Sequence, residues 1–167
     1  MRTHLLAAAV LLVASGPALC APAANAPISE QSLQAAANAI EAAARANDMD
    51  KANSWLASDC VFHVTSPDPK GGMRVDTMTR QQYVDDQAKA KTEGKNEVYK
   101  STVPVVSIKD GKATASMRAT DSQIEGGKSV TTVSDQVETF DLRNGRLMVT
   151  AVSVTVVSLT VDGNRLF

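Results

Sequence analysis

The chain has 167 residues and a formal net charge of −1, with 44% hydrophobic, 21% charged and 4% aromatic residues. This length suits one domain with a proper core rather than two. The balanced charge and the scarcity of aromatic side chains exclude a strongly basic, base-stacking surface, so we expect no nucleic acid partner.

The first twenty residues have the pattern of a secretory signal peptide. A short basic start precedes the apolar run Leu5–Ala14, and Gly16-Pro17 and small residues follow it. The run is too short for a membrane span, so we expect no stable membrane span in the mature form. We predict cleavage after Cys20 and a periplasmic or secreted protein. Lipoprotein anchoring at Cys20 is the alternative, although Leu19 stands where such signals usually carry Gly, Ala or Ser.

Three segments therefore divide the chain: a signal peptide at 1–20, an Ala/Pro linker at 21–28 and one domain at 29–167. The domain begins with helical patterns. Ser29 is a predicted N-cap, and helical spacing predicts a helix to about residue 46. We then expect a short helix at 49–58, a first strand at 60–66, a loop at 67–78 and a helix at 80–94 capped by Thr79.

From residue 97 onward the pattern is strand and turn. Asp110-Gly111, Gly126-Gly127 and Asn144-Gly145 are tight-turn signals, and they separate four runs of about fourteen residues rich in Val, Thr, Ser and Ile. Long antiparallel strands joined by tight turns twist strongly. We predict an α+β domain in which the N-terminal helices pack on a strongly curved antiparallel sheet.

Four pieces of sequence carry a resemblance to a known family: AARANDMDKANSWLASDCVFHV, TMTRQQYVDD, VSIKDGKATASMRAT and VETFDLRNGRLMVTAVSV. Their order resembles the NTF2-like superfamily, in particular its SnoaL-like or DUF4440-like branch. The resemblance implies a cystatin-like cone whose curved sheet and helices enclose a pocket. Members include isomerases, dehydratases, epoxide hydrolases and cyclases, and many others only bind a small molecule or a protein.

Two strands depart from the family pattern. Where ketosteroid-isomerase-like members carry a catalytic Asp on the first strand, this chain has Val64, which cannot transfer a proton. After the last turn, Leu147 stands where relatives often carry Trp, and Ala151 and Ser153 stand where they carry polar groups. These departures favour binding over the family's acid–base chemistry.

Strand alternation and the resemblance together predict a pocket. Its expected wall is Phe62, Val64, Tyr83, Met117, Leu147, Val149, Ala151 and Ser153. The candidate catalytic groups are His63, Asp121 and Tyr83. His63 would face the pocket only if the strand register differs by one residue, and a surface position is the alternative. Asp121 and Asp135 could meet across their hairpin, and Arg118 could pair with Glu138 on the other face.

The cysteine and histidine counts and the valines of the last strand give further limits on the function. After signal cleavage His63 would be the only histidine and Cys60 the only thiol, so we expect no metal site and no cofactor, and a buried inert thiol at Cys60. Val152, Val154 and Val156 alternate on what we take to be the outer sheet face, which predicts a homodimer through that face.

The favoured function is an exported domain that binds a small apolar molecule or a partner protein. The alternative is a SnoaL-like or ketosteroid-isomerase-like enzyme, an isomerase or hydrolase that uses His63 or Asp121 with Tyr83.

Overall fold

The computed structural model describes residues 27–68, 70–92 and 98–167. The predicted signal peptide and most of the predicted linker lie outside these residues. The helices are α1 (Glu30–Arg45), α2 (Met49–Asn53) and α3 (Arg80–Thr92). The strands are β1 (Leu56–Pro67), β2 (Met73–Thr79), β3 (Val98–Ser101), β4 (Val105–Lys109), β5 (Lys112–Glu125), β6 (Lys128–Arg143), β7 (Arg146–Val161) and β8 (Asn164–Arg165).

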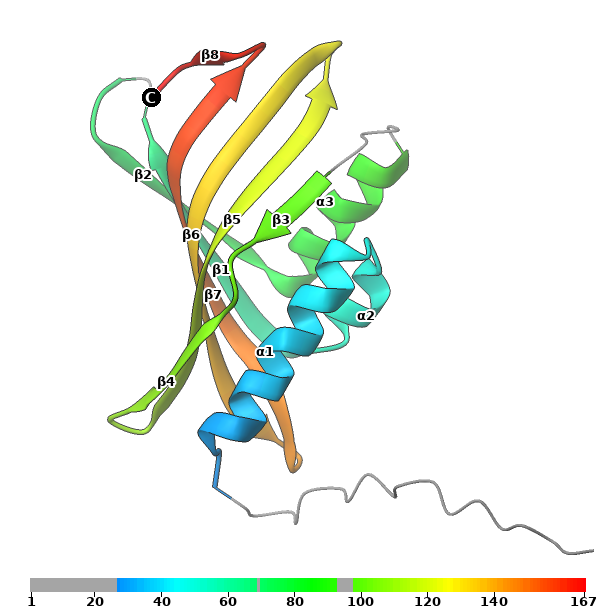
Figure 1. Ribbon diagram of the computed structural model, residues 1–167, viewed down its shortest axis with the longest axis vertical. Helices are drawn as coiled ribbons and strands as arrows, with labels where there is room; N and C mark the ends of the chain where they lie inside the picture. The colour runs from blue at the N-terminus through cyan, green and yellow to red at the C-terminus, as the bar shows by residue number, and fades with distance from the viewer. Residues whose placement is uncertain (1–26, 69, 93–97) are drawn as a thin grey trace, which may run out of the picture.

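The strands form one curved sheet with the order β2-β1-β7-β6-β5-β3, in which β4 also pairs with β5 and β8 with β7. The three helices lie on one side of this sheet, as Figure 1 shows. The predicted α+β architecture is therefore confirmed. The sheet is mixed rather than purely antiparallel, because β1 runs parallel to β7. The long connection that a parallel pair needs is supplied here by everything from β2 to β6.

Local signals explain the helix starts. The Ser29 hydroxyl accepts a hydrogen bond from the Ser32 amide, and the Ser29 amide donates one to the Ser32 hydroxyl, which makes a capping box at α1. Thr79 and Gln82 make the same exchange at α3. Both predicted caps are confirmed. α2 is shorter than predicted, because the chain turns after Asn53 and enters β1 at Leu56.

Two strand assignments differ from the sequence-based expectation. The segment predicted as a loop at 67–78 contains β2, an edge strand that pairs with β1 and with no other described strand. Most of its side chains are exposed, so it lacks the apolar alternation that marks a strand in sequence. The first of the four long runs is divided into β3 and β4, because Pro104 between them has no amide hydrogen to donate.

The predicted turns have the expected backbone. In the Asp110-Gly111, Gly126-Gly127 and Asn144-Gly145 turns both residues have positive φ, for example 54° and 74° in the last. This is the type I′ conformation that suits a two-residue hairpin. The turns fix the register of three hairpins and therefore decide which side chains face the helices.

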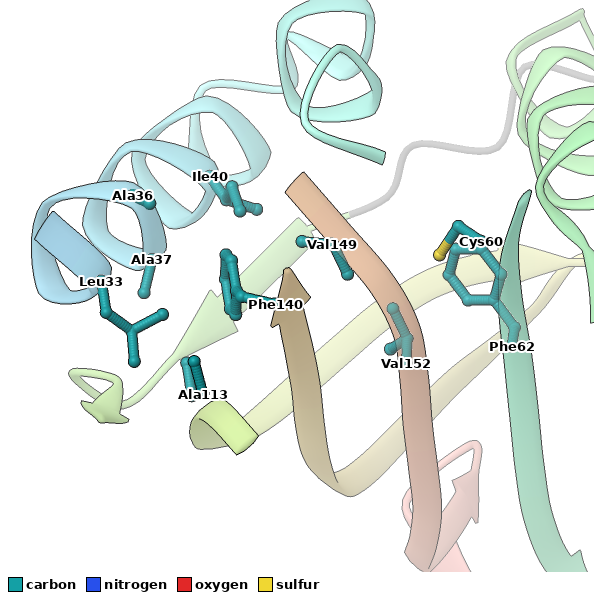
Figure 2. Packing of buried hydrophobic residues seen from close by; sticks show 11 residues of the cluster. Leu33, Ala36, Ala37, Ile40, Cys60, Phe62, Ala113, Phe140, Val149 and Val152 are labelled. Atoms are coloured by element: carbon teal, nitrogen blue, oxygen red, sulfur yellow. The ribbon is translucent and has the colours of Figure 1, made fainter. Parts of the chain in front are cut away.

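The core lies where α1 packs on the sheet. Leu33, Ala37 and Ile40 point toward Ala113 and Phe140, as Figure 2 shows. Leu33 and Ala37 are fully buried. Small alanines on both surfaces let the helix approach the sheet closely, so this end of the cone is filled by the protein's own side chains.

Candidate functional site

Beyond this packed core, a cavity of about 680 Å³ opens between the helices and the sheet. This volume lies within the range of small-molecule sites in proteins. Its apolar wall includes Phe62, Val64, Met78, Val152, Val154 and Val156. Its polar groups include Glu41, Asn53, Tyr99, Asp121, Gln136 and Glu138.

Glu138 lies at the boundary between the core and the cavity. It is two residues before Phe140 on β6, so both side chains point inward, and Phe140 belongs to the core while Glu138 lines the cavity. Its direct neighbours across the sheet are Ala115 on β5 and Val152 on β7. Glu138 thus forms the floor of the cavity between two apolar neighbours.

The Glu138 carboxyl is buried and incompletely paired. The residue is 7% exposed, and its Oε2 atom has no hydrogen-bond partner among the described residues. Burial first, and then the negative charge of Glu41, raise the pKa of Glu138 to about 8. Near neutral pH this carboxyl is therefore mostly protonated and can donate a hydrogen bond into the cavity.

A second buried carboxyl, Glu41 of α1, is satisfied by the protein itself. The Tyr99 hydroxyl donates to Oε1 at 3.0 Å, and the Ser101 hydroxyl donates to Oε2. The Arg45 guanidinium lies 4.0 Å from Oε2 and also donates to Ser101. Glu41 is thus the anchor of a network that ties α1 to β3.

Burial and the neighbouring Glu41 raise the pKa of Tyr99 far above its ordinary range, with smaller contributions from Asp121 and Glu138. Tyr99 therefore stays a neutral hydrogen-bond donor. The Tyr99 hydroxyl therefore lies in a part of the cavity that is rich in carboxyl groups.

Contacts between side chains hold the apolar wall and the helices around it in place. The rings of Phe62 on β1 and Tyr83 on α3 are stacked, with centroids 4.1 Å apart. Asn53 donates to Gln87 at 2.8 Å and thereby joins α2 to α3 beside the cavity. The helices that cover the cavity are thus fixed to one another and to the sheet.

The structure separates the predicted catalytic residues. Asp121 and Tyr83 line the cavity, as does Phe62 beside Tyr83. His63 does not, because it is exposed on the opposite sheet face, where its Nδ1 lies 3.2 Å from the Thr77 hydroxyl. The alternative register that would turn His63 inward is not the one observed.

The predicted pocket wall is partly wrong, and a β-bulge explains the error. Phe140 pairs with Val149, whereas the preceding Thr139 pairs with Ala151, so Thr150 is an extra residue in β7. An extra residue reverses which face the following side chains take.

Leu147 and Val149, before this bulge, point inward as predicted and pack with the core. Ala151 and Ser153, after it, face away from the cavity, while Val152, Val154 and Val156 line it. Of the other predicted wall residues, Val64 lines the cavity and Met117 is buried with its sulfur 4.0 Å from the Tyr99 hydroxyl.

The same correction removes the apolar stripe that we assigned to the outer face. The homodimer prediction loses the three valines that motivated it, and it stays a prediction that solution sizing would test. The outer face instead carries an exposed ion pair, in which Arg118 Nε lies 2.7 Å from Asp135 Oδ1. The hydrogen bond from Arg118 lowers the pKa of Asp135.

This ion pair overturns two expectations. Arg118 pairs with Asp135 rather than with Glu138, because the hairpin register sets Arg118 directly opposite Asp135. Asp121 and Asp135 do not meet, because they point to opposite faces of the sheet.

Sequence reasoning missed Glu138, Glu41 and Tyr99. One signal could have found Glu138. The Gly126-Gly127 turn pairs Glu125 with Lys128, and counting outward from that pair places Glu138 opposite Ala115. Ala115 lies two residues before Met117, a predicted wall residue, so the two share one face of the strand and the partner of Ala115 must also face inward.

Cys60 is buried, as predicted, and is the one free thiol among the described residues. Burial raises its pKa to about 11, with Asp59 and Glu138 adding to the effect and Arg80 opposing it. The described residues contain no group of three His, Cys, Asp or Glu side chains placed to hold a metal ion. None of the three helices described has the length and apolar character needed to cross a bilayer.

No family model matches the sequence. No curated protein matches it either.

Solved structures are similar to this chain in fold. The LinA-type3 hexachlorocyclohexane dehydrochlorinase of Novosphingobium barchaimii LL02 is 12% identical with a TM-score of 0.58, over 77% of this chain and 88% of that one. The beta subunit of the benzoate 1,2-dioxygenase of Burkholderia mallei ATCC 23344 is 14% identical with a TM-score of 0.58, over 79% and 93%.

An NTF2-like protein of Cytophaga hutchinsonii ATCC 33406 is 15% identical with a TM-score of 0.55, over 78% of this chain and 100% of that one. The chain therefore has the NTF2-like, cystatin-like fold.

Proposed function

We propose that this domain binds a small molecule with an apolar body and one polar end inside the cone. The observation that carries this proposal is the cavity itself, which joins an apolar wall to a buried carboxyl with one oxygen that is unpaired within the described part of the chain. Phe62, Val64 and Val154 offer apolar surface that gains free energy when a ligand covers it. Glu138 at the floor offers a polar contact that orients the ligand.

Fold neighbours support a small-molecule site without deciding its chemistry. One neighbour is named as a dehydrochlorinase of hexachlorocyclohexane, a small apolar molecule, and another is a dioxygenase beta subunit. Because one fold hosts many activities, the chemistry must come from the residues of this chain. Here those residues favour binding of an amphipathic small molecule.

The second candidate is the enzymatic alternative, a SnoaL-like or ketosteroid-isomerase-like enzyme. Asp121 and Tyr83, two of the predicted catalytic residues, line the same cavity as Glu138. A carboxyl with a pKa of about 8 can exchange a proton near neutral pH. This candidate predicts that a bound molecule would exchange hydrogen for deuterium in heavy water faster with the protein than without it.

We also propose that the domain acts outside the cytoplasm, because residues 1–20 have the composition of a secretory signal. Sequencing the N-terminus of the protein recovered from the periplasm or the medium tests this. A mature protein that begins after Cys20 supports the proposal, and an intact N-terminus in the cytoplasm contradicts it.

The binding proposal can be tested with Nile red, a neutral dye whose fluorescence rises in apolar surroundings. We expect saturable binding to the purified protein. In Val154→Trp the larger side chain fills part of the cavity. We expect the affinity for the dye to fall at least about tenfold, because the dye loses apolar contacts with the wall. Val75→Trp is the matched control, since Val75 is 60% exposed on β2 and does not line the cavity.

Circular dichroism shows whether both variants keep the fold. Binding that is absent from the wild type, or unaffected by Val154→Trp in a folded protein, would contradict a ligand site in the cone.

A further inference from the structure

The charges that line the cavity are unbalanced. Four lining residues are acidic, namely Glu41, Asp86, Asp121 and Glu138, whereas Arg45 is the one basic residue among the described lining residues. The Arg45 guanidinium already contacts Glu41 and Ser101. Acidic residues therefore outnumber basic residues among the described residues that line the cavity.

Glu138 is the acidic lining residue whose carboxyl group the protein satisfies least. It is more than nine-tenths buried, it lines the cavity, and its Oε2 atom has no hydrogen-bond partner among the residues that the structure describes. Buried polar atoms in native proteins are nearly always paired, so an orphan in a cavity wall indicates a group that a ligand would satisfy. The apolar neighbours Ala115 and Val152 cannot supply that partner.

We propose that the cavity binds an organic amine in its ammonium form, with the ammonium group against the Glu138 carboxyl and the apolar body against Phe62, Val64 and Val154. This inference rests on the proposed function, because it names the ligand class of the same cavity. An anion is disfavoured there, since the nearby carboxyl groups repel it across a medium of low dielectric constant. A neutral molecule gains no charge pairing.

Binding of the ammonium group changes the protonation state of Glu138 at the floor of the cavity. The O–H bond of Glu138 breaks, its proton passes to solvent, and the carboxylate that remains pairs with the ligand's N–H groups. The ligand keeps its own proton throughout. A charge-assisted pair of this kind is about twice as strong as a neutral hydrogen bond, which compensates for ionising a buried acid.

Several titratable and charged groups face Glu138 from the elements packed around it. They are Glu41 of α1, which acts on Glu138, and Cys60 of β1 and Tyr99 of β3, on which Glu138 acts. Beyond them, Arg80 of α3 acts on Cys60, and Asp121 of β5 acts on Tyr99. Cys60 and Tyr99 stay neutral below about pH 9 because their pKa values are raised, that of Cys60 to about 11. Glu138 is therefore the buried group whose ionisation an ammonium ligand would change near neutral pH.

Three molecules with one apolar body test the inference: 4-phenylbutylamine, 4-phenylbutan-1-ol and 4-phenylbutyrate, each used to displace Nile red at pH 7.5. We expect the amine to bind at least about tenfold more tightly than the alcohol, and the carboxylate to bind most weakly. In Glu138→Gln, which keeps the shape and loses the charge, we expect the amine's advantage to fall to about twofold or less.

Calorimetry in two buffers of different ionisation enthalpy counts protons. At pH 7 we expect the amine to release close to one proton from the wild type and none from Glu138→Gln, and the alcohol to release none from either. A merely structural role for Glu138 would not move this count. Release of no proton with tight amine binding would overturn the inference.

The outcomes separate the two proposals. If Nile red binds and the alcohol displaces it as well as or better than the amine, the inference is overturned and the proposed function stands. If Nile red does not bind, the proposed function itself fails. If Glu138→Gln does not fold, displacement of Nile red from the wild type is measured between pH 6 and pH 9. As the pH rises, more Glu138 is already ionised before the ligand binds, so the affinity of the amine relative to the alcohol must grow. A constant ratio of the two affinities would overturn the inference.

Discussion

Glu138→Gln replaces a cavity carboxyl whose ionisation is opposed by its burial. The amide has nearly the same shape as the protonated carboxyl and also carries a donor, so packing against Ala115 and Val152 should be kept. The substitution removes only the possibility of a buried negative charge. We expect the variant to be about as stable as the wild type in acid and clearly more stable in mild alkali.

The magnitude follows from linkage. The pKa of Glu138 is about 8 in the folded protein against an ordinary value of 4.5, so the folded state holds the proton more tightly than the unfolded state. The stabilisation from that proton is complete below pH 4.5 and is lost as pH rises through 8. The full difference corresponds to about 5 kcal/mol, and about 3 to 4 kcal/mol of it develops between pH 5 and pH 8.

The assay is urea unfolding of wild type and variant at pH 5, 6, 7 and 8, followed by circular dichroism. We expect the difference in free energy of unfolding between variant and wild type to increase by about 3 to 4 kcal/mol from pH 5 to pH 8. This corresponds to a difference of roughly 10 °C in melting temperature. Glu30→Gln is the control, since Glu30 is exposed at the start of α1 and should show no such trend. A constant difference between wild type and Glu138→Gln at all four pH values would refute a buried, neutral Glu138.

Three further predictions concern the scaffold. Gly145→Val places a β-branched residue at φ 74° and should destabilise the fold by about 1 to 2 kcal/mol or more, and unchanged thermal unfolding would contradict the type I′ assignment. Ser29→Ala removes one half of the α1 capping box and should cost about 1 kcal/mol in urea unfolding, whereas Ser58→Ala, at an exposed position in β1, should cost little. Cys60 should resist iodoacetamide at pH 8 in the native protein and react after unfolding, because burial raises its pKa to about 11, and rapid native labelling found by peptide mapping would contradict its burial.

The sequence predicted the scaffold well because its local signals are strong. Ser29 and Thr79 cap helices, and Asn144-Gly145 forms a tight turn, since each of these residues acts on its own neighbours along the chain. The parallel contact between β1 and β7 joins residues about ninety positions apart, for example Val61 and Ala151. No local pattern encodes such a pairing.

The cavity was harder to predict because strand alternation fails at an unseen bulge. Thr150 looks like any β-branched strand residue, yet it reverses the faces of Ala151 and Val152. The two faces of β6 were hard to assign for a second reason. The inward face carries Gln136 and Glu138, whereas the outward face carries valine and threonine. Polarity alone assigns the faces of such a strand wrongly, and only the hairpin register corrects it.

Whether the cone holds a small molecule is measured most directly by a high-resolution crystal structure of the protein purified from its native host. We expect electron density for a small organic molecule between Phe62 and Val154, with a nitrogen atom within hydrogen-bond distance of Glu138. A cone filled by the protein's own side chains, or one that holds only water after purification and after soaking with 4-phenylbutylamine, would contradict it.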